Sequence, residues 1–199
     1  MLRDRTDLRA ALWQVAGTQR GFFTATQARE AGYSHQAQHY HAQQGNWTVV
    51  DRGIYRFREF ESLPDGDNDH LVRWALWSKE RGVVSHTTAL SVHDLGTANP
   101  ADVHLTVPPG FRRKSGAVIL HRAELAEDET EQRDGFRVTT PVRAIAECAA
   151  ARMDQDVVRS AVAEALALGL TTRRRLLHAA QRLGAHAELG VERALQDIA

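Results

Sequence analysis

The sequence predicts an α+β protein with an N-terminal winged helix-turn-helix, followed by a mixed α/β domain that ends in a helical C-terminal part. Three observations lead to this prediction. Capped helical segments are separated by glycine-containing turns within residues 6–44, and two β-type segments joined by a short loop follow at 47–57. From residue 70 onward, helical and strand-type segments are mixed before an Ala/Leu-rich end. The first two features, in this order, are typical of a winged helix-turn-helix.

The first two helices are predicted by apolar spacing and by a capping motif. Residues 6–16, TDLRAALWQVA, place their large apolar side chains at helical spacing. The motif TATQAREAG then predicts a capping box, with Thr24 as N-cap and Gln27 three positions later. Gly32 is suited to end this second helix, because glycine readily adopts positive φ after a helix.

A third helix and a β-hairpin complete the predicted winged helix. Ser34 has the side chain of an N-cap for a helix over 34–44. Trp47–Val50 and Ile54–Phe57 are rich in β-branched and aromatic residues, which predicts two strands. Between them, Asp51-Arg52-Gly53 is expected to form a three-residue loop with Gly53 at positive φ.

The acidic segment EFESLPDGDND (59–69) predicts a boundary, so we expect one domain over 1–60 and another over 68–199. The second domain should contain helices in 70–79 and 85–95, strands at 103–108, 117–122 and 136–140, and four helices from Pro141 onward. Ser85 and Thr140 are the expected N-caps, and Pro141 suits the first helical position.

The charge distribution favours a nucleic-acid partner for the first domain only. The whole chain of 199 residues has a formal net charge of zero. Residues 1–58, however, contain eight arginines against four acidic residues, a net charge of +4. No apolar run is long enough to cross a membrane, the N-terminus lacks a signal-peptide pattern, and Cys148 is a single cysteine. We therefore expect a cytoplasmic protein with no membrane partner.

The predicted third helix carries polar groups suited to reading base edges in double-stranded DNA. At 100° per residue, Tyr33, Ala37, Tyr40 and Gln44 should face inward. The opposite face carries histidines and glutamines, and glutamine can pair with adenine in the major groove. Arginines would hold the phosphates. The predicted DNA-contact residues are Arg20, Thr24, Arg29, Ser34, His35, Gln36, Gln38, His39, Gln43, Arg52 and Arg56. A solvated polar face is the alternative.

Neither a metal nor another cofactor is predicted. His35 and His39 are four residues apart and offer two ligands from one helix face, whereas zinc sites need three or four. No cysteine lies nearby, and HExxH, paired-cysteine, Walker and Rossmann motifs are absent from the sequence. Cys148 lies in an Ala-rich helical run and is expected to be a small buried apolar residue.

Ser85, His86, His104 and Thr106 form a second candidate cluster, in the C-terminal domain. Ser85 lacks the GxSxG context of a hydrolase nucleophile, and its adjacency to His86 does not by itself activate the hydroxyl. No catalytic residue is therefore predicted, and the histidines are expected to be buried hydrogen-bonding residues. Binding of a small polar ligand is the alternative. The basic runs FRRK (111–114) and TRRR (172–175) are expected to be solvated, and a second phosphate contact or a docking site for an acidic partner is the alternative.

The ordered motifs resemble a known family over about residues 6–147. GFFTATQAREAGYS, GNWTVVDRGIYRF, VVSHTTALSVHDLG, VHLTVP and RVTTPVRAIAE are together similar to AbiEi-type antitoxins of type IV toxin–antitoxin systems. The resemblance implies a non-enzymatic transcriptional autorepressor that binds operator repeats and counters a nucleotidyltransferase-type toxin. Alternatives are an orphan regulator, a protein-interaction module, or a C-terminal domain acting on a nucleotide or phosphorylated substrate.

Overall fold

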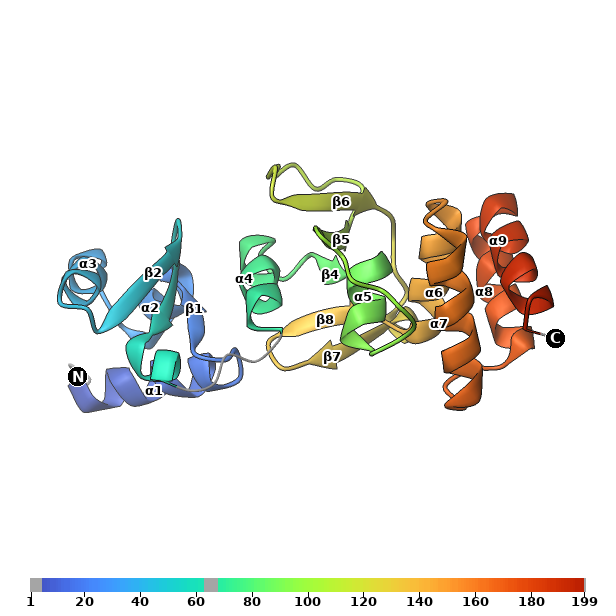
Figure 1. Ribbon diagram of the computed structural model, residues 1–199. Coiled ribbons are helices and arrows are strands. Elements are labelled where there is room, and N and C mark those ends of the chain that lie inside the picture. The colour runs from blue at the N-terminus through green and yellow to red at the C-terminus, as the bar shows by residue number, and fades with distance from the viewer. Residues whose placement is uncertain (1–4, 63–67, 199) are drawn as a thin grey trace. The chain divides into compact units, whose positions relative to one another are not determined.

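The computed structural model describes residues 5–62 and 68–198, and the chain divides into two compact units (Figure 1). One unit comprises residues up to Glu80 together with Arg133–Phe136, and the other comprises Arg81–Gln132 with the residues from Arg137 onward. The helix α4 (Asp69–Trp77) thus groups with the first unit, whereas the sequence placed residues 68–199 in the second domain. The reason is that α4 contacts two strands of the first unit. Pro64 and Gly66, in the predicted boundary, lie outside the described residues.

The first unit has the architecture of a winged helix-turn-helix. Its helices are α1 (Arg5–Gly17), α2 (Ala25–Ala31) and α3 (His35–Gln43), and its antiparallel sheet has the order β1 (Phe22–Thr24), β3 (Ile54–Phe57), β2 (Trp47–Asp51). A 3₁₀ turn, η1 (Arg58–Ser62), follows. The fold class and the three predicted helices are confirmed. The strand β1 was not predicted, because three residues are too few to show a periodic pattern.

The predicted caps of the first unit are present as hydrogen bonds. The Gln27 N–H donates to Thr24 Oγ1, and the Thr24 N–H donates to Gln27 Oε1, which completes the capping box. Gly32 has φ +114°, and the Ala37 N–H donates to Ser34 Oγ at 3.1 Å. These local contacts fix where α2 ends and α3 begins.

An aromatic cluster forms the core of the first unit. Phe23 is fully buried, and its ring contacts those of Trp47 and Phe57 at centroid distances of 4.9 Å each. Leu12 of α1 and Tyr33 before α3 belong to the same cluster. The core therefore links the three helices to the hairpin.

The second unit contains most of a five-stranded mixed sheet of order β6-β5-β4-β8-β7, of which Arg133 and Phe136 are grouped with the first unit. The strands are β4 (Val83–Val84), β5 (Val103–Val107), β6 (Val118–Arg122), β7 (Thr130–Arg133) and β8 (Phe136–Thr139). The strand β5 pairs parallel with β6 and antiparallel with β4. The helix α5 (His86–Val92) is shorter than the predicted 85–95, and η2 (Glu127–Glu129) precedes β7.

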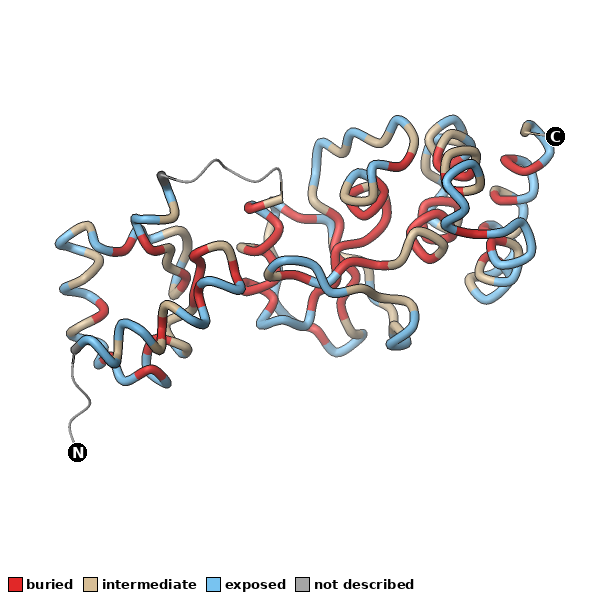
Figure 2. The backbone as a smooth tube through the Cα atoms, turned by 90° about the horizontal axis from the view of Figure 1, so that it is seen from below, coloured by how far each residue is buried: buried red, intermediate tan, exposed pale blue. Residues whose placement is uncertain are grey.

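The C-terminal helices are α6 (Pro141–Ala150), α7 (Gln155–Ala167), α8 (Arg173–Leu183) and α9 (Ala185–Gln196). The helix α6 packs against α5, α7, α8 and α9, and its inward residues are buried (Figure 2). Small residues allow this close approach: at Gly190 an added Cβ would lie 3.0 Å from that of Ala149. No helix in the described part of the chain is long and apolar enough to span a membrane.

Candidate functional sites

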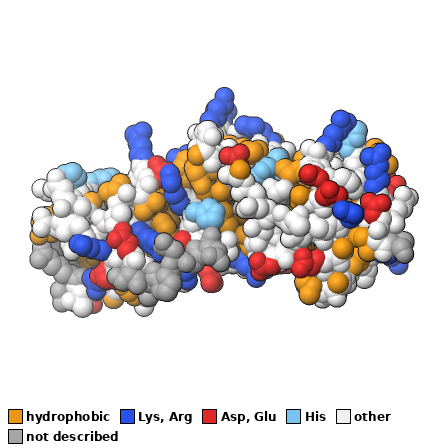
Figure 3. Space-filling view, in the orientation of Figure 1, with side chains coloured by type: hydrophobic (Ala, Val, Ile, Leu, Met, Phe, Trp, Pro, Cys, Tyr) orange, Lys and Arg blue, Asp and Glu red, His pale blue; other side chains and the backbone are white. Residues whose placement is uncertain are grey.

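The outward face of α3 is a continuous polar stripe. His35, Gln36, His39, Tyr40 and Gln43 are all exposed, and these positions recur every three to four residues along one side of the helix. Figure 3 shows histidine side chains among uncharged ones at the surface near α3. The stripe offers imidazole, amide and phenol groups, each of which can hydrogen-bond to base edges or phosphates.

Gln38 does not belong to this stripe, which corrects the prediction that it contacts DNA. Its side chain is buried, and Nε2 donates to the carbonyl oxygens of Ala25 at 3.2 Å and Tyr33 at 3.3 Å. Tyr40, predicted to face inward, is instead 56% exposed. The predicted inward face was rotated away from the observed one. It was counted from Tyr33, which precedes the N-cap and therefore does not follow the rotation of 100° per residue. His41 packs inward and stacks on Trp47 at 4.8 Å.

We expect Gln38→Ala to destabilise the first unit by about 1–3 kcal/mol, because two buried carbonyl oxygens lose their side-chain donor. The matched change His39→Ala, at an exposed position of the same helix, should stay within about 0.5 kcal/mol. Urea unfolding followed by tryptophan fluorescence is the appropriate measurement, since all four tryptophans lie before residue 80. Equal stability of the two variants would contradict the inward role of Gln38.

Two of the predicted phosphate-binding arginines are engaged in an ion-pair network. Arg56 Nη2 lies 2.6 Å from Asp69 Oδ2, and Arg20 Nε lies 2.8 Å from Asp69 Oδ1. The Arg56 side chain is only 12% exposed and also lies over the Phe22 ring. Both arginines therefore position the start of α4, a structural role that the prediction of DNA contacts did not include. This pairing was not predicted, because Asp69 falls in the second predicted domain.

The other two predicted phosphate-binding arginines, Arg29 and Arg52, are exposed, and they precede and follow α3 in the sequence. Arg29 lies on α2 and donates to Thr26 Oγ1 at 3.2 Å, which leaves its guanidinium at the surface. Arg52 is exposed in the turn between β2 and β3, where Gly53 has φ +73°. This turn is tighter than the predicted three-residue loop, because Asp51 pairs with Ile54 in the sheet. Thr24 and Ser34, also predicted as DNA contacts, act as helix N-caps.

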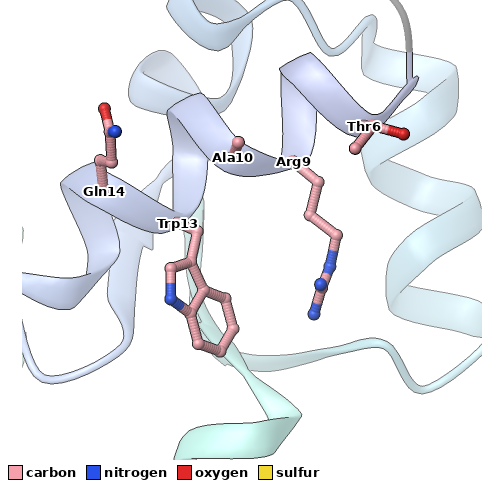
Figure 4. Close-up of a pocket in the computed structure, with 5 residues that line it drawn as sticks. All are labelled: Thr6, Arg9, Ala10, Trp13 and Gln14. Atoms are coloured by element: carbon pink, nitrogen blue, oxygen red, sulfur yellow. The ribbon is translucent and has the colours of Figure 1, made fainter.

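A shallow hollow of about 650 Å³ lies along α1 and is lined by Thr6, Arg9, Ala10, Trp13 and Gln14 (Figure 4). All five residues belong to one helix, and the Arg9 and Trp13 side chains extend toward the same side. Arg9 forms an ion pair with Glu59, and its guanidinium lies 5.1 Å from the Trp13 ring centroid. The charged group that lines the hollow is thus already paired, and we assign no ligand to it.

In the second unit, Glu147 is the centre of a buried polar network. Its side chain is 4% exposed and accepts from Arg143 Nε at 3.0 Å, Thr139 Oγ1 at 3.2 Å and Thr106 Oγ1 at 3.4 Å. The His86 backbone N–H donates to it at 3.4 Å. Burial raises the pKa of Glu147, and the Arg143 guanidinium opposes that shift. A charged pair four residues apart in an otherwise apolar helix was the signal for this network, and our sequence reasoning missed it.

Three histidines lie beside this network. His86 and His104 are buried, as predicted, and His121, which was not predicted, stacks on His86 with ring centroids 3.5 Å apart. Burial, with the neighbouring His121 and His104, lowers the pKa of His86 to about 2. Burial and His104 lower the pKa of His121 to about 4, and burial lowers the pKa of His104. All three rings are therefore neutral at pH 7.

The hydroxyl of Ser85 is directed at its neighbouring histidine. Ser85 occupies the N-cap position of α5 but makes no side-chain cap bond, contrary to the prediction. Its Oγ instead lies 2.9 Å from His86 Nδ1, and the residue has no exposed surface. A substrate therefore has no access to this oxygen in the observed conformation. Cys148 is also buried, and burial followed by the Glu147 charge raises the pKa of its thiol, which fits a packing role.

Comparisons with known proteins find a similar fold for the chain and a family match for part of the first unit. A crystal structure described as that of the RV2827C protein from Mycobacterium tuberculosis matches with a TM-score of 0.59, covering 98% of this chain and 78% of that chain at 13% identity. At that identity the likeness concerns the fold alone. No curated protein matches the chain in sequence. The segment that forms most of the winged helix, residues 12–58, matches the family described as "Transcriptional regulator, AbiEi antitoxin".

Proposed function

We propose that this protein is a cytoplasmic, DNA-binding transcriptional autorepressor that acts as the antitoxin of a type IV pair, with a nucleotidyltransferase-type toxin as its partner. The match of residues 12–58 to an antitoxin regulator family supports the regulatory role. The motifs that extend the resemblance to residue 147 support the choice of antitoxin class. Operator repeats in double-stranded DNA are the proposed binding target.

The exposed stripe of α3 is the observation that carries the DNA-binding proposal. In a winged helix-turn-helix, the second helix of the motif enters the major groove, and α3 holds that place here. His35, Gln36, His39 and Gln43 are exposed and offer imidazole and amide groups, which suit base edges. Arg29 and Arg52 are left for phosphate contacts, because Arg20 and Arg56 bind Asp69.

A titration against the DNA upstream of the protein's own coding sequence tests this division of roles. Arg52→Ala should weaken binding to specific and nonspecific DNA alike and lower the salt slope by about 1. His39→Ala or Gln43→Ala should instead cost about 1–3 kcal/mol for the preferred site only. Glu30→Ala, at an exposed position on α2, serves as the control. Unchanged binding in all three variants would exclude α3 and the turn as the interface.

The toxin partnership is tested separately from DNA binding. Co-expression with an adjacent nucleotidyltransferase-like reading frame should restore growth if the protein is an antitoxin. An Arg52→Ala variant that still neutralises the toxin would place neutralisation outside the DNA interface. Sequence-independent DNA binding together with no neutralisation would instead favour the protein-interaction alternative.

A further inference from the structure

Three histidines from three different elements of the second unit converge on one point. His86 begins α5, His104 lies on β5 and His121 lies on β6. One ring nitrogen from each can be chosen so that all three lie within 4.8 Å of one another. Among the residues that the structure describes, these three form the one group of histidine, cysteine and carboxylate side chains placed closely enough to hold a metal ion. Its members are 17 or more residues apart, so the tertiary fold is what assembles it.

The parallel pairing of β5 with β6 sets two of the ligands at a suitable spacing. Thr106 is opposite His121 and His104 is opposite Ile119, so His104 and His121 lie diagonally on one face of the sheet. His104 Nδ1 and His121 Nε2 are 3.0 Å apart. Two nitrogens bound to one tetrahedral zinc ion at its usual bond length are about 3.3 Å apart. An ion can therefore take the place of this hydrogen bond, once the ring that donates it has shifted its proton to its other nitrogen.

His86 supplies the third imidazole from a restrained backbone. Its φ is +54°, a conformation that a residue with a side chain rarely adopts, and such positions cluster at functional sites. Its Nδ1 contacts Ser85 Oγ at 2.9 Å, which leaves Nε2 as the second ring nitrogen. This matches the usual metal-bound histidine, whose other nitrogen is hydrogen-bonded to a nearby oxygen. Since the His86 and His121 rings are stacked, the His86 ring must turn to direct its lone pair at the ion.

The donor set selects the class of ion. Three neutral imidazoles suit zinc, cobalt, nickel or copper, whereas magnesium and calcium require oxygen ligands. Burial keeps the histidines neutral, as a ligand must be. Glu147 Oε2 lies 3.8 Å from His86 Nδ1, which places a carboxylate just outside the ligands. His121 is half-buried, whereas His86 and His104 are buried, so the cluster meets solvent on the His121 side.

We propose that His86, His104 and His121 form a binding site for a zinc-type divalent ion, with the fourth coordination position open toward solvent. This site differs from the pair His35 and His39 on α3, which offers two exposed ligands. It is independent of the DNA-binding proposal, because all three histidines belong to the second unit.

Zinc titration of the full chain, freed of metal by a chelator, tests the site. We expect binding of one Zn²⁺ per chain in competition with a chromophoric chelator. His121→Asn and His104→Ala should each lower the affinity by more than about 100-fold, since loss of a ligand exceeds the 10- to 100-fold effect of outer-shell changes. Co²⁺ should give the intense visible bands of a four- or five-coordinate site, and the same variants should lose them.

Two controls separate this site from incidental histidine binding. His178→Ala, at an exposed position on α8, should leave the affinity unchanged. The double variant His35→Ala, His39→Ala should do the same. His121→Asn is the decisive variant if His104→Ala fails to fold, because His121 is less buried. The proposal is overturned if the wild type binds no Zn²⁺, if His121→Asn retains the affinity, or if the α3 double variant loses it.

Discussion

Replacement of Glu147 by alanine is expected to lower the free energy of unfolding of the second unit by about 3–5 kcal/mol, the usual effect of removing one partner of a buried ion pair. The change leaves Arg143, whose side chain is 8% exposed, without its i,i+4 carboxylate. It also removes the acceptor of two buried threonine hydroxyls and of the His86 N–H. Glu129 still contacts Arg143 at 2.9 Å, so the arginine retains one partner.

Urea unfolding followed by far-UV circular dichroism measures this loss. Glu147→Gln keeps the shape and an acceptor oxygen, so it should cost less than the alanine variant. Glu124→Ala removes an exposed carboxylate of the same unit and should stay within about 0.5 kcal/mol. Tryptophan fluorescence separately reports on the first unit, where all four tryptophans lie. A Glu147→Ala transition that coincides with the wild type would show that the network contributes little stability.

The winged helix was predictable because its signals are local. The capping box of Thr24 and Gln27, the positive φ of Gly32 and the N-cap Ser34 each depend on residues within four positions. The apolar and aromatic pattern of β2 and β3 is similarly short-range. Such signals fix element type and boundaries, and the structure confirms the three helices and the hairpin of this unit.

The candidate sites were only partly predictable, because they depend on packing and strand pairing. Gln38 faces inward since its amide fits two carbonyl oxygens, a fact that polarity alone cannot show. Asp69 forms ion pairs with Arg20 and Arg56, which lie 49 and 13 residues away in the sequence. His121 joins His104 only through the parallel register of β5 and β6, which no local pattern specifies. Sequence reasoning found two of the three histidines but not their arrangement.

Acid should destabilise the second unit of the metal-free protein well before its carboxylates titrate fully. Histidines in the unfolded chain bind protons below about pH 6.5. In the folded chain, burial lowers the pKa of His121 to about 4 and that of His86 to about 2. The unfolded state therefore binds more protons in this range, so the free energy of unfolding falls as pH decreases. The contribution is fully present above pH 6.5 and is lost progressively toward the folded values.

Between pH 6.5 and 5, protonation of His86 in the unfolded chain should lower the free energy of unfolding by about 2 kcal/mol, at about 1.4 kcal/mol per pH unit. His121 should add a smaller decrease, because its partial exposure to solvent weakens the effect of burial. Glu147 acts in the opposite sense, because its raised pKa lets the folded state bind a proton earlier. Comparison of the wild type with His121→Asn cancels the contribution of Glu147, since both proteins keep this residue. The variant lacks the contribution of His121 itself, and it no longer lowers the pKa of His86 by repulsion. Its unfolding free energy should therefore fall less steeply with acid than that of the wild type, and parallel pH profiles in the presence of a chelator would contradict a buried neutral histidine cluster.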